Sequence, residues 1–133
     1  DYLRWIFGDV KLLFSLNKKI SNLKIDCDDI LLFNGISKQR TIINLSLNFF
    51  SRIEKREVII NGNNFSIKGD LIKNSLILVE KNKIKKIKFK KFDITKSFKN
   101  EHIDIMNKNY KTCCNLAQAL KVQKILNQIR TTL

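Results

Sequence analysis

The sequence contains no proline and only four glycines among its 133 residues. The glycines are Gly8, Gly35, Gly62 and Gly69, and none of them falls in G-x-G-x-x-G spacing. Dinucleotide-binding folds need such a loop because backbone N–H groups and a helix N-terminus hold the pyrophosphate there. We therefore expect this chain to bind no dinucleotide by itself.

Cysteine is also scarce. Cys27, Cys113 and Cys114 show no CxxC or Cys/His spacing, which argues against a zinc site. Adjacent cysteines cannot easily bridge each other, so reduced thiols in a cytoplasmic protein are expected. Cys113 and Cys114 precede a predicted helix, where a thiol can become reactive, but a structural loop is the favoured interpretation.

The single histidine, His102, is the only natural general base near neutral pH. Glu101 and Asp104 flank it, but neighbours one and two positions away do not share a helix face. We therefore favour a surface histidine on a helix over a catalytic one.

The acidic residues Asp26, Asp28 and Asp29 form a second candidate site, since carboxylate oxygens bind hard cations. The cluster lacks the glycine and the distal glutamate of a calcium loop. An ordinary acidic turn is favoured, and no metal is expected.

What the sequence has in abundance is lysine, and the formal net charge is +14. Seven lysines lie in the eleven residues Lys81–Lys91. Such a cluster can bind nucleic acid, but arginine and aromatic residues for base stacking are sparse. A solvated edge strand protected by lysine is favoured. Positive potential would still attract an anionic substrate.

The composition, 44% hydrophobic and 29% charged, is that of a globular protein. The length fits one domain, so residues 1–133 are expected to form a single domain. No segment is long and apolar enough to span a membrane, and the charged N-terminus is not a signal peptide.

Apolar residues with a period of two predict strands through the first two-thirds of the chain. These are Asp9–Ile20, Ile30–Phe33, Thr41–Phe50, Arg56–Ile60, Phe65–Lys68, Ser75–Glu80 and Ile84–Phe89. Turns are expected at Asn34-Gly35, at residues 61–64 and at Gly69-Asp70.

The strand Thr41–Phe50 has the clearest pattern. Its apolar residues, expected to lie under the C-terminal helices, are Ile43, Leu45, Leu47 and Phe49. The alternating polar residues are Asn44, Ser46 and Asn48. In so lysine-rich a chain a solvated face would carry charge, so this open face is predicted to meet a second copy of the chain.

Helices are expected at both ends. Leu3, Ile6 and Phe7 share one helix face, and Gly8 provides a C-terminal cap. A weaker helix is predicted over Asn100–Met106. Asn115 and Gln118 have capping-box spacing before an apolar helical face. The expected fold class is α+β, a mostly antiparallel open sheet with helices packed on one face.

Four segments in this order resemble landmarks of the C-terminal domain of the Gfo/Idh/MocA family of oxidoreductases. They are DYLRWIFGDV (1–10), IDCDDILLFNG (25–35), REVIINGNNFSIKGDLIKN (56–74) and TCCNLAQALKVQKILNQI (112–129). One departure is that Asn63 or Asn64 stands where the hairpin usually has a second glycine.

The resemblance implies a substrate-side and oligomerisation domain of an NAD(P)-dependent sugar or sugar-nucleotide oxidoreductase. The N-terminal Rossmann domain would be absent from this chain, and with it the catalytic Lys, Asp and His. The catalytic residues expected in this chain are therefore none, and Asp1 is a candidate substrate contact. NAD(P) is expected in the full-length enzyme. The alternatives are a basic nucleic-acid-binding α+β module and a standalone assembly scaffold.

Overall fold

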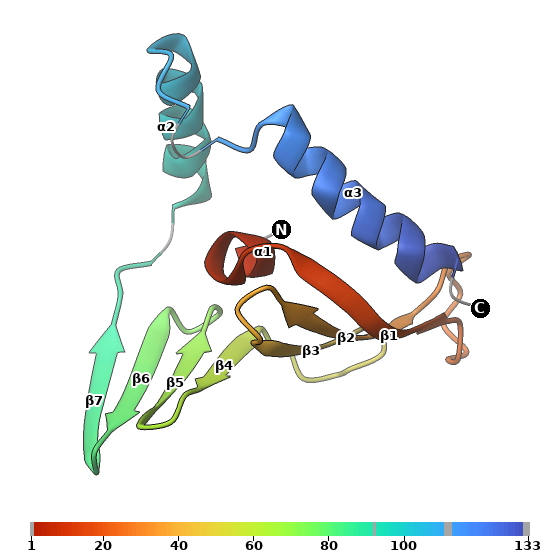
Figure 1. The fold of residues 1–133 in the computed structure, drawn as a ribbon, viewed down its shortest axis with the longest axis horizontal. Helices are drawn as coiled ribbons and strands as arrows, with labels where there is room; N and C mark the ends of the chain where they lie inside the picture. The colour runs from red at the N-terminus through yellow and green to blue at the C-terminus, as the bar shows by residue number, and fades with distance from the viewer. Residues whose placement is uncertain (1, 92, 111–112, 132–133) are drawn as a thin grey trace. The chain divides into compact units, whose positions relative to one another are not determined.

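The computed structural model describes residues 2–91, 93–110 and 113–131 (Figure 1). The elements are α1 (Tyr2–Phe7), β1 (Val10–Lys18), β2 (Ile30–Ser37), β3 (Ile42–Asn48), β4 (Glu57–Asn61), β5 (Phe65–Asp70), β6 (Ser75–Glu80), β7 (Lys83–Lys88), α2 (Ile94–Met106) and α3 (Leu116–Thr131). Every strand pairing is antiparallel. The expected α+β class is confirmed.

The strands are divided between two sheets. One has the order β1-β2-β3 and the other the order β4-β5-β6-β7. The described residues accordingly form two compact units, one from residues 1–51 and 109–133 and the other from residues 52–108. Each neighbour in either sheet is also a neighbour in sequence, which is the pattern expected when short turns connect the strands.

The first unit contains the buried core. Phe33 on β2, Ile43 on β3 and Ile129 on α3 are each 6–7% exposed and lie in one cluster. Ile125, one helical turn before Ile129, packs against the same cluster, so α3 covers this face of the sheet alongside β1 (Figure 1). The predicted apolar face of the last helix is thus confirmed at Ile125 and Ile129. Leu116, Leu120 and Leu126 were also expected on this face but are 77%, 52% and 41% exposed.

Asn34-Gly35 is not a turn, contrary to expectation, because β2 continues through it to Ser37. The chain reverses after Ser37, where Arg40 has a φ of 62°. A Cβ on Gly35 would lie 2.7 Å from a methyl group of Val10 and 2.8 Å from the ring of Phe33. The glycine at this position therefore permits close packing under an aromatic ring instead of a reversal.

β1 contains a bulge. Its pairing with β2 shifts between Leu12, opposite Gly35, and Phe14, opposite Asn34. Leu13 is the additional residue and is 57% exposed. Leu12 packs against the core cluster. Phe14, on the other side of the bulge, lies on the opposite face of the sheet and is 51% exposed.

The second unit is a four-stranded meander. β5 runs on through Gly69-Asp70, where a break was expected, and the reversal follows at Leu71–Asn74. The hairpin between β6 and β7 turns at Lys81-Asn82, with φ values of 45° and 67°. Two consecutive residues with positive φ are typical of the tight hairpin turn that matches strand twist.

The helix boundaries follow their caps. Gly8 ends α1 with a φ of 77°, and its N–H donates to the carbonyl of Arg4, as predicted. α2 begins at Ile94, earlier than the predicted Asn100, because Oδ1 of Asp93 accepts the N–H of Lys96. The predicted capping box at α3 is confirmed: Asn115 and Gln118 exchange hydrogen bonds of 3.0 and 2.9 Å.

Candidate functional site

The sheet β1-β2-β3 leaves one face uncovered by the core. Residues in register share a face, so this open face is made by Lys11, Phe14, Leu16, Lys18, Ile30, Leu32, Asn34, Ile36, Ile42, Asn44, Ser46 and Asn48. Its only charges are Lys11 and Lys18 on β1. The middle of the face is apolar or amide, and Ile42 is 60% exposed.

The alternation predicted for β3 is confirmed in part. Ile43 is buried and Leu45 packs against the core, while Asn44, Ser46 and Asn48 are exposed on the open face. Leu47 and Phe49 were expected to be buried but are 53% and 69% exposed. Both lie toward the end of β3 or after it, beyond the described core.

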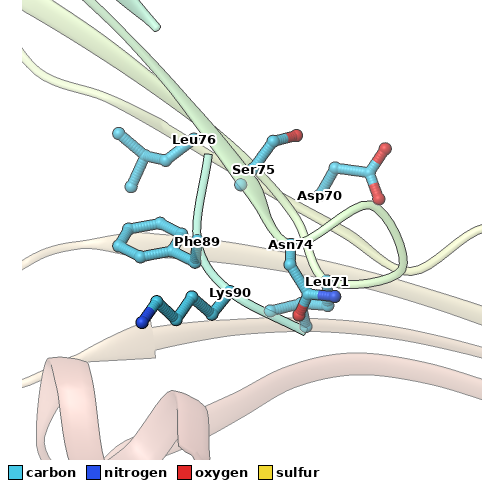
Figure 2. A pocket seen from close by; sticks show the side chains of 8 residues that line it. Asp70, Leu71, Asn74, Ser75, Leu76, Phe89 and Lys90 are labelled. Atoms are coloured by element: carbon cyan, nitrogen blue, oxygen red, sulfur yellow. The ribbon is translucent and has the colours of Figure 1, made fainter. Parts of the chain in front are cut away.

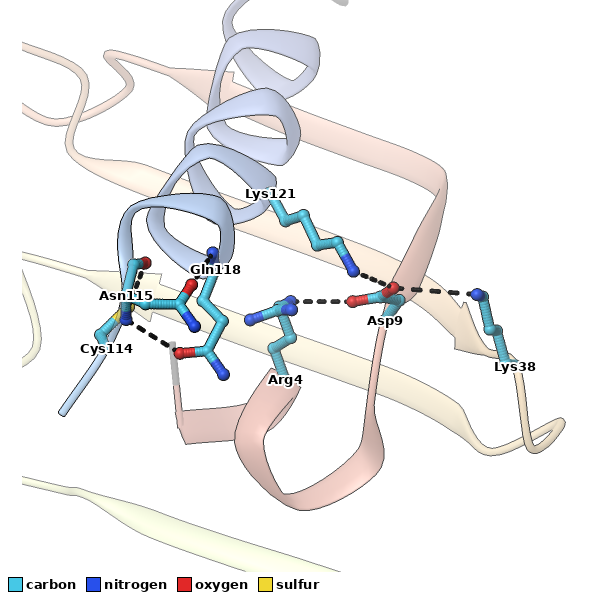
Figure 3. A network of polar contacts seen from close by, with 7 residues as sticks. All are labelled: Arg4, Asp9, Lys38, Cys114, Asn115, Gln118 and Lys121. Atoms are coloured by element: carbon cyan, nitrogen blue, oxygen red, sulfur yellow. Dashed lines mark hydrogen bonds and ion pairs between the residues drawn. The ribbon is translucent and has the colours of Figure 1, made fainter. Parts of the chain in front are cut away.

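Asp9, between α1 and β1, is the centre of a polar network (Figure 3). Its carboxylate lies 2.9 Å from Nε of Arg4 and 2.8 Å from Nζ of Lys121, with Nζ of Lys38 at 3.8 Å. The hydrogen bond from Lys121, with that from Arg4, holds the pKa of Asp9 below its usual range against a smaller effect of burial. Sequence reasoning missed this site because its partners are far apart in the chain.

Of the three acidic residues in the predicted turn, Asp29 is the one that is buried. It is 1% exposed. Its carboxylate accepts the backbone N–H groups of Ile20 and Ser21 at 2.8 and 2.9 Å, as well as the Ser21 hydroxyl. Burial raises the pKa of Asp29, but these hydrogen bonds together outweigh burial and lower it.

The carboxylate of Asp29 therefore stabilises the connection between β1 and β2 through these hydrogen bonds. Asp28 instead accepts a hydrogen bond from Asn17. Within the described ranges no cluster of three or more His, Cys, Asp or Glu side chains could hold a metal ion. The favoured interpretation as an acidic turn agrees with these contacts.

The remaining single-residue candidates are on the surface. His102 is exposed on α2, and its Nδ1 lies 2.7 Å from the carbonyl oxygen of Phe98. Cys114 is exposed and Cys113 half-buried, and neither is in a disulfide. Asp1, the candidate substrate contact, lies outside the described residues.

The lysine-rich segment 81–91 covers β7, an edge strand of the second sheet. All seven lysines are exposed. None of them forms an ion pair within the part of the chain that the structure describes. Ile84, which lies among these lysines, is also 66% exposed. The predicted edge position is confirmed.

A hollow of about 250 Å³ lies at one end of the second sheet (Figure 2). Leu71, Leu76 and Phe89 provide its apolar walls, with Asp70 and Lys90 beside them. The carboxylate of Asp70 already accepts the N–H groups of Ile72 and Lys73. The hollow is smaller than a typical ligand site, and two polar side chains that line it, Asp70 and Asn74, already form hydrogen bonds with the backbone of the adjacent turn.

No helix within the described ranges is long and apolar enough to cross a membrane. No protein-family model and no curated protein matches the sequence.

Solved structures do match the fold. UDP-N-acetylglucosamine 3-dehydrogenase from Acidithiobacillus ferrooxidans, in two crystal forms, gives TM-scores of 0.79 and 0.80 at 14% identity, over 98% of this chain and 42% of that protein. A Thermotoga maritima protein described as an oxidoreductase gives 0.73 at 13% identity, over 97% of this chain and 40% of that protein. The chain thus spans about two-fifths of these structures. Its fold is that of one part of these oxidoreductases, which confirms the fold expected from the resemblance to the Gfo/Idh/MocA C-terminal domain.

Proposed function

We propose that this chain is the substrate-side and oligomerisation domain of an NAD(P)-dependent sugar or sugar-nucleotide oxidoreductase. The observation that carries the proposal is the match of nearly the whole chain to part of a UDP-N-acetylglucosamine 3-dehydrogenase. The complete enzyme would also contain a nucleotide-binding domain outside these 133 residues. By resemblance, it would transfer a hydride between a sugar carbon and the nicotinamide.

The described residues do not fit the cofactor. No glycine-rich loop is present. In the first turns of α2 and α3, N–H groups that could otherwise hold a phosphate already donate to side chains: the N–H of Lys96 donates to Oδ1 of Asp93, and the N–H of Gln118 donates to Oδ1 of Asn115. No step of the reaction is therefore assigned to this chain, and its role would be to bind the sugar and to hold the assembly together.

The substrate side of the proposal depends on charge and position. A net charge of +14 favours an anionic substrate such as a sugar phosphate or sugar nucleotide. Asp1 is proposed as a substrate contact from the resemblance alone.

The oligomerisation side depends on the open face of β1-β2-β3. Phe14, Leu16, Leu32 and Ile42 lie there beside small amides and hydroxyls. An apolar face with charge only toward one edge suits a two-fold contact between identical sheets.

The test is to express the complete reading frame that contains these residues. Nicotinamide absorbance is then followed with UDP-N-acetylglucosamine and with unphosphorylated sugars as substrates. Turnover of a sugar or sugar nucleotide is expected. A complete protein that binds neither NADH nor NADPH would contradict the proposal.

A further inference from the structure

Strand β7 forms an edge of the second sheet (Figure 1), and within the described residues no strand pairs with its outer side. Phe89, directly after β7, donates its N–H to the carbonyl of Asn74, directly before β6. Hydrogen-bonded pairs alternate along an antiparallel ladder, so the backbone groups of Ile84, Lys86 and Lys88 point away from β6. Such a row of open N–H and C=O groups is what an additional strand can pair with.

The side chains of β7 have a regular order, since the strand reads KIKKIK, which is the same from either end. Side chains alternate along a strand, so Lys83 and Lys85 lie on one face of the sheet and Lys86 and Lys88 on the other. We call these four residues the lysine edge. Of the β6 residues opposite them only Glu80 is acidic, and it is opposite Lys83. The other three lysines therefore have no carboxylate across the ladder.

A second copy of the chain does not suit this edge. Two β7 strands paired antiparallel would set lysines of one copy against lysines of the other, and like charges directly opposite are destabilising. The lysines thus protect the edge from pairing with itself, as the sequence predicts. The same lysines favour a strand with carboxylates at the matching positions, because specificity depends on the pairings that are repelled as well as on those that form.

A nucleic acid also suits the edge poorly. The lysine edge divides its charges between both faces of the sheet, so a duplex lying against one face approaches only the lysines of that face. An added strand has the same alternation as β7, and its side chains reach both faces at once. Ile84, which is exposed between the lysines, offers an apolar contact on the same strand.

We propose that β7 is a docking strand for an extended acidic segment of a partner protein, which adds to the four-stranded sheet as its next strand. The segment has the pattern acidic, apolar, acidic, acidic, apolar, acidic. This order places a carboxylate opposite each member of the lysine edge and an apolar side chain opposite Ile84 and Ile87. The inference does not depend on the function proposed above, because it involves neither the cofactor nor the sugar.

Two peptides of equal composition test the order of the charges. One fluorescein-labelled peptide has the core EVEEVE and the other has the core EEVVEE, and each is titrated with the 133-residue chain at physiological salt. Fluorescence anisotropy should show about tenfold tighter binding of EVEEVE, because only this order sets every carboxylate opposite a lysine. Equal affinities, or no saturable binding of either peptide, would overturn the proposal. Tighter binding of random duplex DNA than of EVEEVE would overturn it in favour of a nucleic acid.

A charge exchange locates the site. Lys85→Glu with Lys86→Glu should lose affinity for EVEEVE and gain affinity for EVKKVE, in which the two central charges are reversed. The matched control, Lys96→Glu with Lys99→Glu, makes the same change in charge at exposed positions of α2 and should bind EVEEVE like the parent. An equal loss in both variants would mean that net charge, not the lysine edge, attracts the peptide. The comparison of peptides needs no variant, so a variant that does not fold leaves it valid.

Amide hydrogen exchange followed by NMR tests the backbone pairing. Binding of EVEEVE should slow exchange several-fold at the N–H groups of Ile84, Lys86 and Lys88, which point to the open edge. The N–H groups of Lys85 and Ile87 point to β6 and should change little. Peptide binding that leaves all five exchange rates unchanged would show charge attraction without strand addition, and the inference would be wrong.

Discussion

Lys121 on α3 places its ammonium nitrogen 2.8 Å from Oδ2 of Asp9, a residue 112 positions earlier in the chain. The other oxygen of the same carboxylate accepts a hydrogen bond from Arg4 on α1. One side chain therefore connects the closing helix to the first helix, at the point where β1 begins. The contact is electrostatic, so its contribution depends on pH.

Asp9→Asn should lower the thermal unfolding midpoint at neutral pH. The pKa of Asp9 is lower in the folded chain than in the unfolded chain, mainly because of the hydrogen bond from Lys121. Its stabilisation is therefore present above the unfolded pKa of about 3.9 and is lost as the pH falls through the folded value. The variant should lack that part of the acid-induced loss, as measured by circular dichroism melting over a pH series.

Asp26→Asn is the matched control, because Asp26 is exposed and forms no hydrogen bond or ion pair with the described residues. It should melt like the parent at every pH. Equal midpoints for Asp9→Asn and the parent at neutral pH would mean that the network around Asp9 does not stabilise the fold.

Phe33→Ala should destabilise the first unit by about 3–5 kcal/mol, because it leaves a cavity in the core. Phe33 is 6% exposed and contacts the same cluster as Ile129. Urea unfolding measures the change. Phe49→Ala is the control, since Phe49 is 69% exposed, and it should change stability by less than about 0.5 kcal/mol. Similar losses for both variants would contradict the described core.

Asn44→Lys with Asn48→Lys should convert an oligomer into a monomer. The two substitutions set like charges against each other across a contact between two open faces. Sedimentation velocity measures the mass, and circular dichroism should be unchanged. The matched control adds the same charge at the β4–β5 turn through Asn63→Lys and Asn64→Lys. If the parent chain is already a monomer at tens of micromolar, the interface is wrong for the isolated chain.

The 133-residue chain should show no saturable binding of NADH or NADPH in calorimetric titration. The physical reason is that the sequence has no glycine-rich loop. In addition, the side chains of Asp93 and Asn115 already accept N–H groups at the starts of α2 and α3. A dissociation constant in the micromolar range would disprove this expectation.

The lysines of β7 should bind random duplex DNA weakly, and this binding should disappear near physiological salt. They lie on an exposed edge strand, with no aromatic row for base stacking. Replacing Lys85, Lys86 and Lys88 with Gln should reduce the low-salt binding further. Nanomolar binding to one sequence at physiological salt would instead favour the nucleic-acid-binding alternative.

Local signals in the sequence were sufficient for much of the fold. The capping box of Asn115 and Gln118 and the cap at Gly8 each depend on residues within one turn, so the sequence alone predicts them correctly. Asp93 could have been recognised as an N-cap in the same way. It was missed because the first turns of α2 are polar and weakly periodic.

Tertiary contacts account for what was missed. Asn34-Gly35 has the sequence of a hairpin turn, but the ring of Phe33 requires a glycine below it within a continuous strand. The separation into two sheets has no local signal, since every hairpin looks alike in either arrangement. The polar network of Asp9 joins segments that no spacing rule relates, so only the folded chain reveals it.

The bulge in β1 gives this strand a tolerance that its neighbours lack. A strand normally exchanges its two faces when one residue is lost, because side chains alternate. Leu13 is the surplus residue of the bulge, so a chain without it keeps Leu12 toward the core and Phe14 on the open face. A deletion of Leu13 should therefore leave both the buried core and the outward surface in place, whereas a deletion elsewhere in β1 would exchange the two faces of the strand beyond it.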